Sequence, residues 1–284
     1  MKEFEAKIKN NPNDGEAYNA WGESLLSEGK FEEAINKFET SISINSEYFA
    51  PYLNWGSALL QMGNLNEALI KLQQSIAYNP KEPTAYVIIG IIYDRLGTFD
   101  KAVASYLQTI QIDPKFPSVY HNLGISYDHL GEKEKAMEYY EKSISINPTY
   151  ECYRSWGICL NSLGRYKEAR EKYKLAIDID SNNDAAIINY GTSLMDENLL
   201  FESCNYFLDL LINRISMSND SFALSYTSAY HYIISNINEV DSEIKNKIKL
   251  IYDKLKSYES VYSDDYTHKF KELTTNLYNI FFNS

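Results

Sequence analysis

Residues 86–114 contain the pattern that decides the fold, YVIIGIIYDRLGTFDKAVASYLQTIQIDP. Large apolar side chains recur three and four positions apart in its first half, which is the spacing of one face of an α-helix. Gly97 interrupts that spacing, and the second half resumes it from Phe99. Pro114 ends the pattern, because proline cannot continue a helix. The stretch therefore predicts two helices joined by a glycine turn.

This pattern repeats along the chain. In each copy a large apolar or aromatic residue is followed, three positions later, by a second large apolar residue and then by glycine. The six glycines are Gly22, Gly56, Gly90, Gly124, Gly157 and Gly191. Successive members of this set are separated by 34, 34, 34, 33 and 34 positions. A period of this size indicates one supersecondary unit stacked several times, since a single unit cannot bury its apolar face alone.

Three further positions keep the same period. A second turn residue follows seven positions after the first glycine, at Gly29, Gly63, Gly97, Gly131, Gly164 and Asn198. Next comes a small residue, at Ala34, Ala68, Ala102, Ala136, Ala169 and Ser203. Four residues later a large apolar residue follows, at Phe38, Leu72, Tyr106, Tyr140, Tyr173 and Phe207. We expect the first glycine and the alanine to lie on facing helices of one hairpin, where leucine would overpack the crossing by about 1–3 kcal/mol.

The pattern resembles the tetratricopeptide repeat over residues 15 to about 215. The resemblance implies an all-α fold, a right-handed α-solenoid, in which antiparallel helix hairpins form a superhelix. Its six repeats are expected at 15–48, 49–82, 83–116, 117–149, 150–183 and 184–215. The family usually has tryptophan at the first aromatic position and leucine three residues later. Here tyrosine holds the first place, and tryptophan holds the later one at Trp21, Trp55 and Trp156. We interpret this departure as an alternative filling of the same core.

Residues 1–14 are expected to form half a hairpin. If Pro12 is a closing proline, Phe4 and Ile8 fall at the apolar places of a second helix. This half-repeat is either a native N-terminal cap or the result of a cut in a longer protein.

Residues 216–284 lose this period. Helices are predicted there at about 221–236, 242–259 and 264–282. We interpret them as C-terminal capping helices, because a stacked array needs a terminal element that covers its last apolar face. Self-association through these helices is the alternative.

Composition and charge narrow the possible partners. Lys and Arg number 27 and Asp and Glu 39 in 284 residues, which gives a formal net charge of −12 and argues against nucleic acid as a partner. No uncharged apolar run reaches the length of a membrane span, and charges occupy the place of a secretory signal, so no membrane insertion is expected. Three cysteines are too few for a disulfide scaffold. We expect a cytoplasmic protein.

The sequence contains no recognisable catalytic motif. Cys152 and Cys159 lie seven residues apart, about 10 Å along one predicted helix, which is too far for a disulfide. Both take places that small residues usually occupy, and Cys204 follows the alanine-equivalent Ser203, so we expect three buried thiols. His121 and His129 lie eight residues apart, about 12 Å along a helix, which is too far for a shared metal ion. The sequence therefore predicts no enzyme, no cofactor and no metal site.

The resemblance implies that the first helix of each hairpin lines a concave groove for a partner peptide. The inward places include an apolar strip that consists of Val87, Ile91, Ile125 and Ile158. Polar residues rim this strip at Asp94, Arg95, His121, Asp128, Arg154 and Asn161. Exposed apolar strips with polar rims mark partner sites. The alternative is that some of these isoleucines pack between neighbouring first helices.

Asn54, Asn122 and Asn189 occupy the same place in every second repeat. They resemble half of the asparagine ladder that grips an extended peptide backbone in some family members, and an amide can both donate to and accept from a peptide bond. The groove lacks lysine at the places that the family's carboxylate clamp requires. The resemblance therefore implies no binding of acidic chaperone tails.

Together these features predict a scaffold or adaptor for protein–protein interaction, which holds a partner peptide or helix in its groove. The alternative hypothesis is a dedicated chaperone or assembly factor for one client protein, of the secretion or pilus type. An acidic surface would keep such a client in solution.

Overall fold

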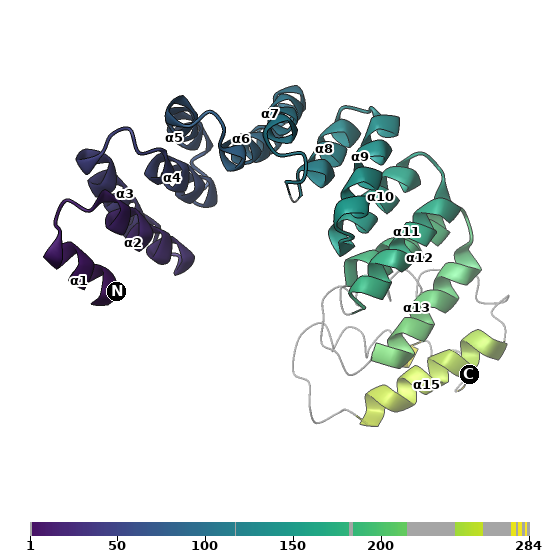
Figure 1. Cartoon of the computed structure of the whole chain (residues 1–284). Coiled ribbons are helices and arrows are strands. Elements are labelled where there is room, and N and C mark those ends of the chain that lie inside the picture. Colours follow the sequence, from purple (N-terminus) through teal and green to yellow (C-terminus); the bar gives the residue numbers. More distant parts are fainter. Residues whose placement is uncertain are drawn as a thin grey trace. The chain divides into compact units, whose positions relative to one another are not determined.

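The computed structural model describes residues 2–116, 118–181, 184–214, 242–257, 274–276, 278–279 and 282. Regular secondary structure in these ranges is helical, with no strand. The chain forms two compact units, Met1–Asn147 (unit 1) and Pro148–Ser284 (unit 2). In each unit consecutive helices pack against one another (Figure 1). The predicted all-α solenoid of helix hairpins is confirmed.

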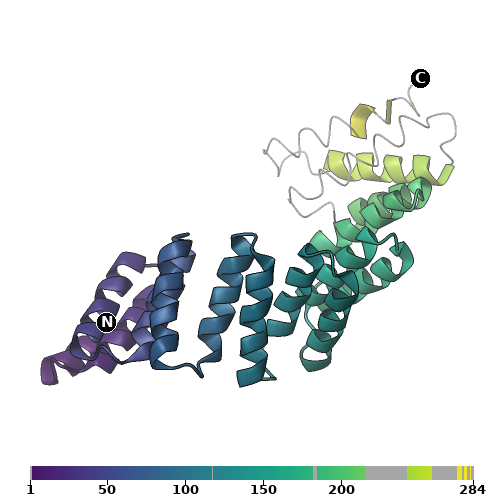
Figure 2. The same ribbon diagram turned by 90° about the horizontal axis from the view of Figure 1, so that it is seen from above.

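Unit 1 contains nine helices within the described residues. They are α1 (Lys2–Asn10), α2 (Gly15–Ser27), α3 (Phe31–Ile44), α4 (Phe49–Gln61), α5 (Leu65–Tyr78), α6 (Pro83–Arg95), α7 (Phe99–Ile112), α8 (Val119–His129) and α9 (Lys133–Ile146). From α2 onward they pair as hairpins α2/α3, α4/α5, α6/α7 and α8/α9, and each hairpin packs on the next (Figure 2).

Unit 2 continues the same arrangement. Its helices are α10 (Tyr150–Ser162), α11 (Tyr166–Ile179), α12 (Asp184–Asp196), α13 (Leu200–Arg214) and α15 (Ser242–Ser257). The hairpins α10/α11 and α12/α13 pack through α11 and α12. Helix α15 packs on α13 and buries Ile244, Ile248 and Ile251. The helix predicted at 221–236 and most of the one predicted at 264–282 lie outside the described residues.

The second glycine of each repeat makes the turn inside the hairpin. Gly97 has a φ angle of +69°, in the left-handed region that glycine adopts without steric cost. Its N–H donates to the Asp94 carbonyl at 3.0 Å, and the Thr98 N–H donates to the Tyr93 carbonyl at 2.9 Å. This pair of bonds is a Schellman motif, which satisfies the last carbonyls of a helix. Asn198 has a φ angle of +64° and donates in the same way, so the predicted turn is confirmed in all six hairpins.

The first glycine of each repeat makes room for a large side chain of the second helix. A Cβ atom added at Gly90 would lie 2.3 Å from Cε1 of Tyr106, which is far inside van der Waals contact. The same close approach pairs Gly22 with Phe38, Gly56 with Leu72, Gly124 with Tyr140, Gly157 with Tyr173 and Gly191 with Phe207. The first glycine and the alanine lie on facing helices of the hairpin, as expected. The closest neighbour of the glycine is the side chain four positions beyond the alanine, which needs the space.

Three of the tyrosines at the first aromatic place bond to the end of the preceding repeat. The Tyr86 hydroxyl donates to the carbonyl of Pro80 at 3.2 Å, and the Tyr120 hydroxyl donates to the carbonyl of Pro114 at 2.8 Å. Tyr52 makes the same bond six residues back. A tryptophan there could not reach in this way, because its indole nitrogen lies elsewhere on a larger ring. These bonds give a physical reason for the tyrosine at this place.

The tryptophans at the later place each lie beneath a lysine of the second helix. The Nζ atoms of Lys37, Lys71 and Lys172 lie 3.8, 3.4 and 3.7 Å from the ring centroids of Trp21, Trp55 and Trp156. Such cation–π contacts stabilise a hairpin by about 0.5–2 kcal/mol. Burial lowers the pKa of Lys71, as expected for an ammonium that is partly removed from water. The alternative filling of the core is therefore a matched aromatic–lysine pair.

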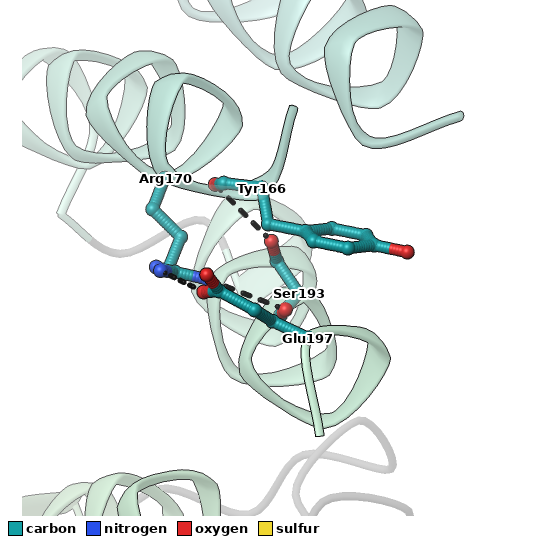
Figure 3. Close-up of polar contacts among 4 residues, drawn as sticks. All are labelled: Tyr166, Arg170, Ser193 and Glu197. Carbon is teal, nitrogen blue, oxygen red and sulfur yellow. Dashed lines mark hydrogen bonds and ion pairs between the residues drawn. The ribbon is translucent and has the colours of Figure 1, made fainter. Parts of the chain in front are cut away.

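A buried ion pair joins α11 to α12 in unit 2. Arg170 donates to Glu197 and, at 3.3 Å, to the carbonyl of Ser193, while the Ser193 hydroxyl donates to the carbonyl of Tyr166 (Figure 3). Earlier repeats have apolar residues at the place of Arg170, which are Ile35, Leu69, Val103 and Met137. The place of Glu197 is likewise apolar in the four repeats that precede it, at Met62, Leu96, Leu130 and Leu163. This junction therefore has a polar contact at places that are both apolar in the second to fifth repeats, except for Arg170 itself; the first repeat has Glu28 at the place of Glu197 but Ile35 at the place of Arg170.

Helix α1 covers the open side of α2. The ring of Phe4 stacks on Trp21 with centroids 6.4 Å apart and planes 7° apart. Among the described residues, no helix is both long and apolar enough to cross a lipid bilayer.

The glycine–ring contact yields a first prediction. Gly90→Ala places a methyl group against the Tyr106 ring and should lower the free energy of unfolding by about 1–3 kcal/mol. Gly15→Ala is the control, because its Cβ would lie 3.4 Å from its nearest neighbour, which is an ordinary contact. Its effect should stay within about 0.5 kcal/mol. Urea denaturation followed by circular dichroism measures both, and equal effects would show that the glycine is not needed for space.

The ion pair yields a second prediction. Glu197→Ala leaves the Arg170 guanidinium buried without its acid and should cost about 2 kcal/mol, less than a fully buried pair because the Glu197 side chain is 25% exposed. The double variant Arg170→Leu/Glu197→Leu restores an apolar contact like that of the earlier repeats. It should match or exceed the wild type in urea denaturation. A double variant less stable than Glu197→Ala would show that the ion pair itself is required for packing.

Candidate functional site

The first helices of successive hairpins lie against each other. Helices α2, α4, α6 and α8 are in contact in that order in unit 1, and α10 contacts α12 in unit 2. Within the described residues, successive second helices make no such contacts. Neighbouring first helices are therefore closer together than neighbouring second helices, so the first helices lie on the inner side of each unit's curve. We call the exposed side of the first helices the inner face.

The four residues of the predicted apolar strip do not share one environment. Val87 on α6 is buried, with 6% of its surface exposed. Ile91 on α6 is partly buried and packs against the core between the second and third repeats, and Ile125 on α8 is also partly buried. Ile158 belongs to unit 2, where it is 39% exposed on α10. Ile158 is therefore the strip residue with the most surface for a partner.

The amide of Asn54 is used inside unit 1. Its Nδ2 donates to Oδ1 of Asn19 at 3.0 Å and to Oε1 of Glu23 at 2.6 Å, and Asn19 itself donates to Glu23 at 2.8 Å. Asn19 and Glu23 belong to α2 and Asn54 to α4. The predicted ladder residue therefore fastens one first helix to the next.

Asn122 and Asp94 take part in a second network of unit 1. The Tyr106 hydroxyl donates to one oxygen of Asp94 at 2.7 Å, and the Ser126 hydroxyl donates to the other at 2.7 Å. Asn122 also hydrogen-bonds to the Tyr106 hydroxyl. Burial raises the pKa of Asp94, and the bonds from Ser126 and Tyr106 partly offset that rise. The Tyr106 ring packs against Gly90, and this packing buries its hydroxyl. A buried hydroxyl needs hydrogen-bond partners, and this network supplies them.

Other rim residues of unit 1 also have partners within it. Arg95 donates to the carbonyl of Leu60 at 3.3 Å, near the end of α4, and Asp128 pairs with Lys133. His121 lies beside a tyrosine, with its ring centroid 6.1 Å from that of Tyr140. Each of these side chains touches a group of unit 1 itself. The polar rim predicted in this unit is thus engaged in contacts within the unit.

The inner face of unit 2 differs in this respect. Arg154 on α10 is half-buried and makes no hydrogen bond or ion pair to any described residue; it lies near Tyr150 and Tyr173. The Nδ2 atom of Asn189 on α12 is buried and has no hydrogen-bond partner there. Asn161 donates to Asp196 at 2.7 Å, but its own Oδ1 has no partner among the same residues. In the described part of unit 2, Arg154 and Asn161 therefore lie one turn to either side of the exposed Ile158 on α10, and the neighbouring helix α12 carries the unpaired amide of Asn189.

No sequence feature points directly to the partners Asn19, Glu23 and Ser126. One indirect signal was available: tyrosine at the buried large apolar place, as at Tyr106, requires a polar neighbour for its hydroxyl. The predicted buried thiols are confirmed, since Cys152, Cys159 and Cys204 are all buried. In the part of the chain that the structure describes, no group of three His, Cys, Asp or Glu side chains could hold a metal ion.

The family models that match this chain all describe one kind of repeat. Models described as tetratricopeptide repeat match residues 117–150 and 157–183, and one described as TPR repeat matches 22–63 and 92–131. No curated protein matches the chain.

Among the solved structures with similar folds, three are matched by this chain over most of their own length. The crystal structure of MamA is 26% identical, covers 59% of this chain and 92% of its own, and has a TM-score of 0.53. YrrB, described as a TPR protein with an unusual peptide-binding site, is 16% identical over 65% of this chain and 95% of its own, with a TM-score of 0.54. A tetratricopeptide repeat protein from Parabacteroides merdae ATCC 43184 is 15% identical over 92% and 99%, with a TM-score of 0.63.

The burial of Asp94 yields a prediction about pH. Because its pKa is raised in the folded state, its contribution to stability is fully present below the pKa of the unfolded chain and is lost as pH rises through the folded value. Asp94→Asn removes this titration. Relative to that variant, the wild type should lose free energy of unfolding as pH rises from about 3 towards neutrality. Urea denaturation across this range measures the difference, with Asp100→Asn as a charge-matched control on α7. Parallel curves for wild type and Asp94→Asn would contradict the assignment.

Proposed function

Since this chain belongs to the tetratricopeptide repeat family, we propose that it is a non-enzymatic scaffold or adaptor that binds a segment of a partner protein on its inner face. The observation that carries this proposal is the exposed Ile158 on α10, one helical turn from Arg154, which has no ion-pair partner among the described residues. An exposed apolar side chain with polar groups around it is the usual make-up of a partner site. The peptide-binding site named for YrrB is consistent with this use of the fold, although the likeness extends to the fold alone.

The predicted contacts are unequally supported. Apolar residues would anchor partner side chains, asparagines would hold the backbone, and Arg95, Arg154 and His121 would select charge. In unit 1 the amide of Asn54 already has partners, and Val87 is buried. We therefore assign the main contact to α10 and α12 of unit 2; Ile125 belongs to the inner face of unit 1, where it is partly buried.

A dedicated chaperone or assembly factor for one client is the second candidate. The net charge of −12 favours it, because a strongly charged surface keeps a complex with an aggregation-prone client in solution. The two candidates differ in specificity. A chaperone of this type would co-purify with one client in a fixed ratio, whereas an adaptor would recover several proteins that share a segment.

Site-specific photo-cross-linking tests the proposed face. A benzoylphenylalanine at position 125 or 158 should cross-link a partner in the source cell, because both positions lie on the inner face. Positions 70 and 104 are the controls, since Ile70 and Ala104 are exposed on second helices. Cross-links at 70 and 104 but not at 125 and 158 would place the partner elsewhere and refute the proposal.

A further inference from the structure

We propose that the inner face of unit 2 binds the carboxylate of an Asp or Glu side chain within a partner peptide, between the guanidinium of Arg154 and the amide of Asn189. The proposal rests on the proposed function and names the chemistry that the partner must carry. It commits to an acidic side chain inside a segment, as opposed to a free C-terminal carboxylate.

Unit 1 contains the internal precedent for this contact. Asn54 donates to the carboxylate of Glu23 at 2.6 Å and to the amide oxygen of Asn19 at 3.0 Å. Glu23 lies 31 positions before Asn54, and Asn19 lies 35 positions before it. The first helix of one repeat thus supplies a carboxylate to the asparagine of the next.

The same register in unit 2 places different residues around the asparagine. Arg154 lies 35 positions before Asn189, and Ile158 lies 31 positions before it. The first glycines of the two repeats concerned have the same spacing in unit 2, at Gly157 and Gly191, as in unit 1. Arg154 and Ile158 therefore take the places of Asn19 and Glu23. Neither can accept a hydrogen bond, which explains why the Nδ2 atom of Asn189 is buried without a partner among the described residues.

Arg154 also lacks an acid, because Ile158 stands at the place that Glu23 has in unit 1. It makes no hydrogen bond or ion pair to the described residues, and the acid at the far end of this face, Asp196, accepts from Asn161 at 2.7 Å. Arg154 is half-buried without an acid, and Asn189 on the neighbouring first helix has an amide without an acceptor. The Nδ2 atom itself is closed to solvent, but Asn189 as a whole is only partly buried, so a rotation of its side chain turns the amide toward a ligand beside Arg154. A carboxylate has two oxygens and accepts from both, and an ion pair with arginine strengthens the bond. Ile158, 39% exposed, is then available for an apolar residue next to the acid.

The third asparagine shows that the site does not recur in unit 1. The residues 35 and 31 positions before Asn122 are Val87 and Ile91, which carry no charge. Asn122 bonds to the Tyr106 hydroxyl instead. Of the three asparagine places, that of Asn189 alone combines an unpaired amide with an unpaired cation in the described part of the chain.

Selection from a displayed peptide library tests the proposal on the full chain. Both peptide ends are joined to the carrier protein, so no free C-terminus is present. Selected peptides are then made with blocked ends, and their binding is measured by fluorescence anisotropy. They should contain Asp or Glu next to a large aliphatic residue, and changing that Glu to Gln should weaken binding at least about tenfold.

Variants of the protein identify the groups involved. Arg154→Gln should weaken the binding of acidic peptides at least about tenfold. It should cause no further loss of affinity when the Glu of the peptide has been changed to Gln. Lys167→Gln removes a positive charge from an exposed place on the second helix α11 of the same unit and should leave binding unchanged. Ile158→Glu places a carboxylate where Glu23 stands in unit 1. It should abolish binding without lowering the melting temperature, whereas the size-matched Ile158→Leu should bind as the wild type does.

The outcomes separate this inference from the proposed function. Selected peptides that lack acids and bind Arg154→Gln as well as the wild type would overturn the inference and leave the proposed function standing. A requirement for a free C-terminus, seen with unblocked peptides, would also overturn it. Failure of both selection and photo-cross-linking would refute the proposed function and the inference with it.

Discussion

The close approach of a first-helix glycine to a large side chain of the second helix is the contact on which each hairpin depends. Tyr106 beside Gly90 shows what the contact requires: a residue without Cβ on one helix and a large apolar side chain on the other, which is an aromatic ring in five hairpins and Leu72 in one. The contact also determines part of the surface. A phenylalanine beside the glycine needs no hydrogen-bond partner. A tyrosine places its hydroxyl among the inner-face residues, where a buried hydroxyl needs such a partner. Asp94 on the inner face of unit 1 meets that need.

Core and inner face are therefore coupled, and the two units differ in the result. In unit 1 the amide of Asn54 and the carboxylates of Asp94 and Asp128 all have partners from the unit itself. These contacts connect neighbouring helices and leave fewer groups for a ligand. In the described part of unit 2 the groups of Arg154 and Asn189 have no such partners. The asparagine place of the repeat thus occurs with an acceptor from the unit itself, at Asn54, and with an acceptor that only a partner would supply, at Asn189.

The sequence predicted what depends on local pattern. The period, the glycine turns and the hairpins follow from spacing and from the conformational range of glycine, so they were accessible from the residues alone. The partners of individual side chains were not, since these depend on which neighbouring helix supplies an acceptor. Asn54 and Asn189 occupy the same repeat place and looked alike in sequence, but the residue 31 positions earlier is Glu23 in one case and Ile158 in the other. Comparing repeats at this spacing would have revealed the difference. The ion pair of Arg170 was missed because that place is apolar in the earlier repeats.

The side-chain amide resonances of Asn189 and Asn54 provide the most direct measurement of the central claim, that unit 2 lacks an acceptor which a partner supplies. Both can be followed by nitrogen-15 NMR while an end-blocked peptide with a central glutamate is added. The account predicts that the Asn189 amide protons shift as a new acceptor reaches Nδ2, while those of Asn54 stay in place because Glu23 already holds them. A peptide that saturates the protein without moving the Asn189 resonances would contradict it.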